Sequence, residues 1–182
     1  GTPYYYGVWL KHLSYLFDNG ICEVPESIAE LGPGDTLGLG IAALLCGAKR
    51  FYGLDVVAHT NPANNLRVLD GIADLIRRRA PRPGKGWPDF DHLLDVKLFP
   101  SRILTDERLS ASLSLQRIEA VRHILTTQKE QAEDITLAYR VPWSDTSVIE
   151  RDTIDLIISQ AVLEHVVDVE RERIDRDLAV GV

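Results

Sequence analysis

The chain has 182 residues, a length that fits one domain of ordinary size with a core large enough to fold unaided. Its formal net charge of −7 argues against general binding to nucleic acid or to an anionic membrane, because affinity for phosphate groups needs a basic surface. No apolar run approaches the roughly 20 residues that cross a bilayer, and no signal peptide is visible, so we expect a cytoplasmic protein without a membrane segment.

The two cysteines, Cys22 and Cys46, form no C-x-x-C pair. This favours a reduced chain, with Cys46 in a buried helix, over a disulfide. The five histidines show no metal-ligand spacing, and we predict no metal site. The chain starts at Gly1 and contains no methionine, so we expect it to be either a fragment of a longer protein or a sequence with some residues missing.

Residues 4–17 are predicted to form a helix, because apolar residues between Trp9 and Phe17 recur on one helical face. We treat residues 1–23 as an N-terminal helical segment with two interpretations. It is either a lid over a ligand pocket or a helix packed against a sheet. Residues 24–182 are predicted to form an α/β domain.

Residues 27–48 predict a strand, a glycine-rich turn and a helix in succession. Gly32 and Gly34 put no Cβ between the backbone and a ligand, so the turn and the helix N-terminus after it can approach one closely. The helix over 38–46 is small and apolar all round, which is typical of a helix buried between a sheet and a second layer. A strand over 50–54 follows, and so compact a unit implies parallel strands with a right-handed crossover.

Asp55 ends this second strand about 20 positions after the turn, where an α/β fold can hold a ribose hydroxyl. A helix to about Arg79 is predicted next, with Asn61 as its N-cap and Pro62 at its first position. Residues 80–112 contain several prolines and glycines, and we expect an irregular insertion that selects the substrate.

The last part of the chain returns to alternating elements. A helix is predicted over 115–129, and strands are predicted over 135–141 and 154–159. Another helix should follow over 160–168. No internal repeat or low-complexity segment is present.

Three motifs, read together, resemble those of class I S-adenosylmethionine-dependent methyltransferases. The segment from Glu30 to Gly34 is similar to the first motif of that family, and Asp55 matches its ribose-binding acid. The segment from Ile154 to Val166 resembles the fourth motif, an apolar strand that leads into a leucine-x-histidine-valine sequence. The resemblance covers about residues 24–59 and 134–168.

This resemblance implies a Rossmann-like, doubly wound, mostly parallel sheet with helices on both faces. The first motif often has a third glycine, and here Thr36 stands in that place. Too few residues follow the strand over 154–159 to complete the family's seven-stranded sheet, so we expect the last strands to be lacking.

The resemblance also implies S-adenosylmethionine as the cofactor. Asp55 would bind the ribose, Glu30 the ammonium of the amino-acid tail, and Asp145 the adenine amino group. Trp143 would cover the adenine, although a tryptophan here also fits a core position. The implied cofactor-binding residues are Glu30, Gly32, Gly34, Asp55, Trp143, Asp145 and Ser159.

The activity implied is in-line methyl transfer to a small-molecule acceptor, which depends largely on holding donor and acceptor in place. A general base is needed only if the acceptor must lose a proton early. His165, just past the last predicted strand beside Glu164, is the candidate base, and its alternative is a structural role at a helix start. His59 is a weaker candidate.

Two other functions remain open. The first is a non-catalytic, methyltransferase-like binding module. The second is an NAD(P)-dependent oxidoreductase, because Gly34, Gly38 and Gly40 have the glycine spacing of short-chain dehydrogenases. That family also needs a Tyr-x-x-x-Lys pair, which the chain lacks.

Overall fold

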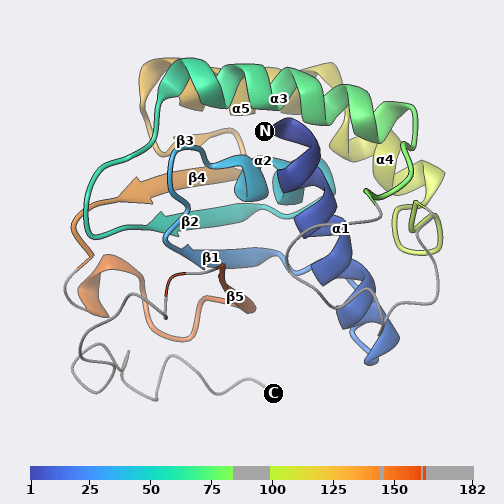
Figure 1. The fold of residues 1–182 in the computed structure, drawn as a ribbon, viewed down its shortest axis with the longest axis horizontal. Coiled ribbons are helices and arrows are strands. Elements are labelled where there is room, and N and C mark those ends of the chain that lie inside the picture. Colours follow the sequence, from blue (N-terminus) through green and yellow to red (C-terminus); the bar gives the residue numbers. More distant parts are fainter. Residues whose placement is uncertain (84–98, 144–145, 161, 163–182) are drawn as a thin grey trace.

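A computed structural model of the protein describes residues 1–83, 99–143, 146–160 and 162 (Figure 1). These residues contain one sheet with the strand order β3-β4-β2-β1-β5. Strands β4, β2, β1 and β5 are parallel, and β3 is antiparallel to β4. The expected α/β class with a mostly parallel sheet is therefore confirmed. The strands are β1 (Ser27–Leu31), β2 (Arg50–Leu54), β3 (Gln131–Ala132), β4 (Ile135–Arg140) and β5 (Leu156–Ser159).

The strand order reverses at β1. The chain passes from β1 through β2 to β4 on one side, and then returns to place β5 on the other side of β1. In open parallel sheets, ligands bind outside the carboxyl ends of the strands where the order reverses. That crevice lies here at the ends of β1 and β5, where Leu31 pairs with Ser159.

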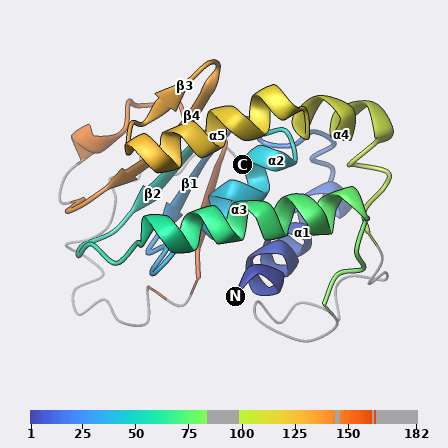
Figure 2. The ribbon, with the colours of Figure 1, turned by 90° about the horizontal axis from the view of Figure 1, so that it is seen from above.

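The α-helices of the described residues contribute to one hydrophobic core on one face of this sheet. Helix α2 contacts β2, while α1 and α3 pack onto α2. Helix α5 lies beside α3 and contacts β4, as Figure 2 shows from above. The helices are α1 (Thr2–Asp18), α2 (Gly38–Leu45), α3 (Pro62–Arg77), α4 (Asp106–Ser112) and α5 (Leu115–Thr127).

Side chains alternate between the two faces of the sheet, as the pleat of a strand requires. Ile28 and Phe51 point into the helical core. Leu31 and Leu54 belong to a second, smaller cluster on the other face. Residues from the connection between β4 and β5 complete this cluster, namely Trp143, Val148, Ile149 and Ile154.

The prediction of helices on both faces is met on one face only. In the described part of the chain, the second face is covered by the β4–β5 connection, which contains the short 3-10 helix η2 (Thr146–Val148). The helix predicted over 160–168 falls almost wholly outside the described residues. An α-helical layer on the second face therefore stays a prediction.

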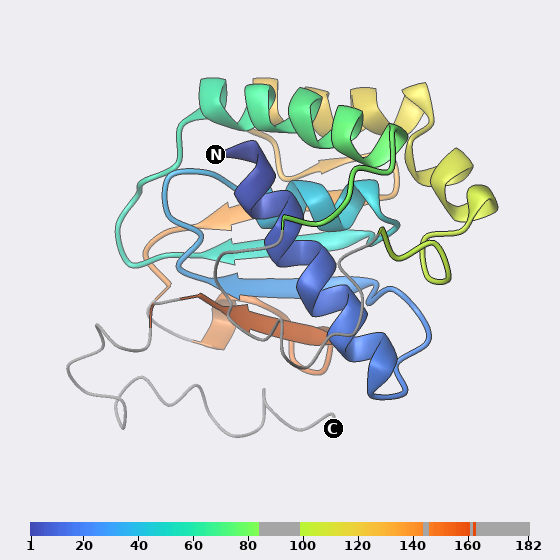
Figure 3. The same cartoon turned by 45° about the vertical axis from the view of Figure 1, so that its right-hand side comes forward.

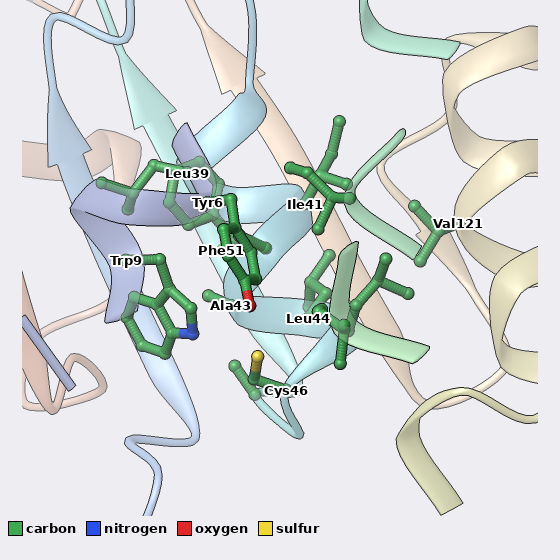
Figure 4. Packing of buried hydrophobic residues seen from close by; sticks show 14 of the residues in the cluster. Tyr6, Trp9, Leu39, Ile41, Ala43, Leu44, Cys46, Phe51 and Val121 are labelled. Carbon is green, nitrogen blue, oxygen red and sulfur yellow. The ribbon is translucent and has the colours of Figure 1, made fainter. Parts of the chain in front are cut away.

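Helix α2 is buried all round, as its composition predicted. All of its residues are buried, because the sheet covers one side while α1 and α3 cover the others (Figure 4). Cys46, directly after this helix, is a free, fully buried thiol. Burial raises the pKa of Cys46 to about 12, which makes the thiol unreactive at neutral pH.

The predicted start of α3 is confirmed. The Asn61 side chain accepts a hydrogen bond from the backbone N–H of Ala63 at 2.9 Å, and Pro62 occupies the first helical position. A proline is tolerated there because the first N–H groups of a helix have no intrahelical partner.

The prediction of an irregular insertion over 80–112 is wrong at its C-terminal end, where α4 forms. The Thr105 hydroxyl accepts a hydrogen bond from the Arg108 N–H at 3.3 Å. Asp106 and Glu107 occupy the first turn, where negative charge is favourable. Residues 84–98, the centre of this segment, lie outside the described residues.

Strand β3 was not predicted from the sequence. It has two residues and joins β4 through a turn in which Glu133 adopts a φ of 55°. A strand this short carries too little alternation to be recognised. It extends the sheet beyond β4 with one antiparallel ladder.

Helix α1 shares the core of the sheet and is not a separate unit. Trp9 and Leu10 are fully buried, and Figure 3 shows α1 running obliquely across the strands. None of the helices in the described ranges combines the length and the apolar character needed to cross a bilayer.

We predict that Gly40→Ala lowers the free energy of unfolding by about 1–3 kcal/mol, the usual cost of overpacking a core. A Cβ at this position would overlap the ring of Phe51, which is fully buried in β2. Urea unfolding curves measure the change.

The matched control is Gly71→Ala, another substitution inside a helix. Its Cβ would meet the side chain of Thr2, with Cγ2 at 2.7 Å and Oγ1 at 3.1 Å, so the start of the chain has to shift slightly. Alanine favours a helix over glycine by roughly 1 kcal/mol, which offsets this shift, so this variant should lose less stability than Gly40→Ala. Equal losses in both variants would contradict the proposed contact with Phe51.

Candidate functional site

The candidate site lies at the carboxyl edge of the sheet, where β1 and β5 end. The glycine turn follows β1, Asp55 follows β2, and Trp143 follows β4. The backbone N–H of Trp143 donates to the carbonyl of Asp55 at 3.1 Å, which joins two of these segments. The first turn of α1 lies against the glycine turn, where the Tyr5 hydroxyl donates to Asp35 Oδ1 at 2.9 Å.

The glycine turn has the backbone geometry that its two glycines permit. Gly32 has a φ of 67° and Gly34 a φ of 74°, a region in which other residues are strained. A Cβ at Gly32 would also overlap the side chain of Val162. A Cβ at Gly34 would meet nothing within 4 Å, so the backbone there faces open space.

Two of the N–H groups at the start of α2 are already hydrogen-bonded. Asn65 Oδ1 accepts from the Leu37 N–H at 2.8 Å, and Thr36 Oγ1 accepts from the Gly38 N–H at 3.0 Å. Asn65 and Thr36 are both buried. Thr36 and Asn65 therefore satisfy the start of the helix and leave fewer donors for a bound phosphate.

Asn65 was not predicted as part of this site. It lies within the amphipathic α3 and is only 4% exposed. A buried asparagine in a helix needs partners for its polar atoms, and that requirement was the only signal in the sequence.

Glu30 and Asp55 form a pair of buried acids at the ends of β1 and β2. Each is only 6% exposed. Glu30 Oε2 is buried and has no hydrogen-bond partner among the described residues. Burial, and after it the charge of Asp55, raises the pKa of Glu30 to about 8, so this carboxyl group is mostly protonated at neutral pH.

An unpaired carboxyl oxygen in such a place is costly unless a donor reaches it. A ligand that brings an ammonium group would satisfy the oxygen and also favour the ionised carboxylate. The pair therefore fits a cationic, hydrogen-bond-donating ligand better than an anionic one.

Asp55 is held by hydrogen bonds from two directions. Its Oδ1 accepts from the Val56 N–H at 2.9 Å, and its Oδ2 accepts from the Tyr139 hydroxyl at 3.4 Å. The same hydroxyl accepts from the His59 N–H at 3.0 Å. Tyr139 thereby ties the segment after Asp55 to β4, a role that sequence patterns did not reveal.

Val56 and Val57 directly follow Asp55 and are 58% and 57% exposed. Two neighbouring apolar side chains in the open beside a buried acid are suited to contact a flat apolar group such as a base. Sequence analysis missed them, because their exposure is visible only in the folded chain. His59 is placed nearby through its backbone.

The other predicted site residues have different positions. Trp143 is half-buried and packs on the smaller hydrophobic cluster of the second face, with Leu31 and Leu54. This position agrees with the alternative that Trp143 is a core residue. Ser159 is half-buried at the end of β5. Asp145, Glu164 and His165 lie outside the described residues.

The histidine that the structure places at this edge is His12, from α1. Its Nε2 lies 3.0 Å from the Gln160 Nε2, one residue past the end of β5. Burial lowers the pKa of His12 to about 4, so the ring is neutral at pH 7. Sequence analysis missed it, because a histidine on an otherwise apolar helix gives no indication of what it faces.

A separate small cleft of about 160 Å³ lies between α5 and the β3–β4 turn. It is at the amino end of β4, so the length of the sheet separates it from Asp55. Within the described residues, no group of three or more histidine, cysteine, aspartate or glutamate side chains is arranged to hold a metal ion.

Comparisons of the chain with protein-family profiles, with curated proteins and with solved structures found no match.

We predict that Glu30 makes the protein less stable as pH rises from 5 to 8. Its pKa in the folded state, about 8, lies above the ordinary value of 4.5, so the folded chain holds a proton that the unfolded chain has lost. We expect the wild-type free energy of unfolding to fall by more than about 1 kcal/mol between pH 5 and 8. Glu30→Gln should remove this dependence on pH. Urea midpoints at several pH values measure it.

The matched control is Glu26→Gln. Glu26 is exposed and its hydrogen bond with Lys49 lowers its pKa, so its contribution to stability changes only in acid. That variant should follow the wild-type profile between pH 6 and 8. A Glu30→Gln profile parallel to wild type would contradict the assignment.

Proposed function

We propose that the protein is an S-adenosylmethionine-dependent methyltransferase that acts on a small-molecule acceptor. The observation that supports it best is the buried pair of Glu30 and Asp55, with one unpaired carboxyl oxygen, beside an open glycine turn where the strand order reverses. Fold alone does not decide between functions, so the proposal depends on this site and its chemistry.

The residues present fit the groups of S-adenosylmethionine. Asp55 would accept hydrogen bonds from the ribose hydroxyls, and Glu30 would accept one from the ammonium of the tail. The backbone at Gly34 is open for the tail to approach. Val56 and Val57 would contact the adenine.

Three further residues of the predicted cofactor site have proposed roles. Ser159 ends β5 at the crevice, and we propose that it binds the cofactor. Asp145 stays the proposed partner of the adenine amino group. Trp143 packs on the second-face cluster, so we assign it the support of the Asp55 segment through its backbone.

The same geometry argues against a dinucleotide. A pyrophosphate needs free N–H groups at a helix N-terminus, and Leu37 and Gly38 already donate to Asn65 and Thr36. A non-catalytic binding module would have the same cofactor site, and only turnover separates it from an enzyme.

When bound, S-adenosylmethionine supplies a methyl group carried on a positively charged sulfur. The task of the chain is to hold this donor in line with the acceptor and to exclude water. Asp55 would hold the ribose of the donor and Glu30 the ammonium of its tail. His12 adds no positive charge beside Gln160 at the end of β5, because its ring is neutral at pH 7. We keep His165 as the proposed base for an acceptor that must lose a proton.

Titration calorimetry with S-adenosylhomocysteine and with NADH tests the proposal. We expect binding of S-adenosylhomocysteine, and Asp55→Asn should weaken it by at least about 1 kcal/mol, the scale of a lost hydrogen bond to a charged group. Asp70→Asn is the matched control, since Asp70 is an exposed acid paired with Arg122 on the helical layer. Binding of NADH alone would refute the methyltransferase.

Cofactor binding should also release a proton at pH 7. Glu30 is mostly protonated in the free protein, since its pKa is raised to about 8, and an ammonium beside it would favour the ionised form. The heat of S-adenosylhomocysteine binding should therefore differ between phosphate and Tris buffers at the same pH. Glu30→Gln should abolish this difference, and a wild-type heat independent of buffer would exclude the proton release.

A further inference from the structure

The hydroxyl of Tyr139 contacts the segment that follows β2 at three residues. It lies 3.4 Å from Asp55 Oδ2 and 3.3 Å from the Val57 carbonyl oxygen, and it accepts a hydrogen bond from the His59 N–H at 3.0 Å. A hydroxyl has one proton, which it donates to one of the two oxygens or shares between them. This one side chain therefore holds both the acid and the backbone that carries Val56 and Val57.

The sheet fixes the position of this tyrosine. Tyr139 pairs with Gly53 of β2, and a Cβ at Gly53 would lie 3.4 Å from Tyr139 Cδ2, so the ring lies directly beside the end of β2. The carbonyl of the next residue, Arg140, accepts from the Asp55 N–H at 3.2 Å. Burial raises the pKa of Tyr139, so its hydroxyl is protonated and able to donate at pH 7.

Asp55 and the pair Val56-Val57 are proposed above to bind two parts of one ligand, the ribose and the adenine. We propose that Tyr139 is a positioning residue of this site, which holds the acid and the two valines in the arrangement that lets one nucleoside contact both. This inference rests on the function proposed above. It assigns Tyr139 a role that the sequence motifs do not contain.

The physical reason is the exposure of the segment that Tyr139 holds. Val56 and Val57 are 58% and 57% exposed, so packing of their own side chains does little to order this backbone. Without the hydroxyl, part of the binding free energy would be used to order the segment when ribose and base bind together. A ligand that contacts only one of the two parts gains less from their fixed arrangement.

Adenosine and 2′,3′-dideoxyadenosine test this role in chemical-shift titrations. They carry the same base, and only adenosine has the ribose hydroxyls that Asp55 would bind. Tyr139→Phe removes the hydroxyl and keeps the ring, so it should weaken adenosine binding by about fivefold, the scale of a lost neutral hydrogen bond. It should leave the affinity for 2′,3′-dideoxyadenosine within about twofold of wild type, since this ligand lacks the contact with Asp55.

Tyr52→Phe is the matched control. Tyr52 is a half-buried tyrosine of β2 that pairs with Ala138, the neighbour of Tyr139 in β4. Tyr139 packs against the helical core, whereas Tyr52 packs against the cluster on the second face. The control therefore removes a hydroxyl from the other face of the sheet, and it should bind both nucleosides like wild type.

Hydrogen exchange in the wild-type protein tests the role without any substitution, and so it applies even if Tyr139→Phe fails to fold. The His59 amide, which donates to Tyr139, should exchange with solvent more slowly when adenosine is bound, because a ligand that contacts both parts stabilises the segment between them. Saturating 2′,3′-dideoxyadenosine should slow this exchange less.

An unchanged adenosine affinity in Tyr139→Phe, or an equal loss for both nucleosides, would overturn the role of Tyr139. The same holds if both nucleosides slow the His59 exchange equally. Binding of S-adenosylhomocysteine to wild type separates the two proposals. Without it the proposed function fails and this inference fails with it, whereas binding together with any of the contrary results above refutes the role of Tyr139 alone.

Discussion

The close contact between Gly40 of α2 and Phe51 of β2 determines how near the first crossover helix lies to the sheet. A helix that approaches the sheet so closely is buried on every side, and α1 and α3 can then pack directly onto it. The same contact fixes the start of α2 and therefore the turn that precedes it. The position of the candidate site is in this sense a consequence of core packing.

The electrostatic character of the site follows from burial. Glu30 and Asp55 end neighbouring strands, and each is almost completely removed from solvent. Burial, and after it the charge of Asp55, raises the pKa of Glu30, and the structure leaves one oxygen of Glu30 without a partner among the described residues. A site of this kind is completed by a cationic donor. This requirement, more than the shape of the turn, favours a sulfonium cofactor with an ammonium tail over a dinucleotide.

Much of the fold could be predicted because local patterns agree with tertiary packing. The all-apolar composition of α2 predicted its burial, and Asn61-Pro62 predicted the start of α3. Prediction failed at α4, because the prolines and glycines that precede it led to an irregular assignment of the whole segment. It also failed at β3, because two residues are too few to show the alternation that marks a strand. Helices on the second face of the sheet were expected from family resemblance, and the described residues place all α-helices on the first face.

The sequence by itself determined the types and order of the elements, the glycines of the turn and the acids that end β1 and β2. These depend on residues close together in the chain, whose propensities and spacing can be read directly. Only the tertiary structure decided that Asn65 uses a donor at the start of α2, that His12 of α1 lies beside Gln160 just past β5, and that Trp143 packs on the second face. Each of these is a contact between segments far apart in the sequence, and no local pattern records which segments the packing of the core will bring together.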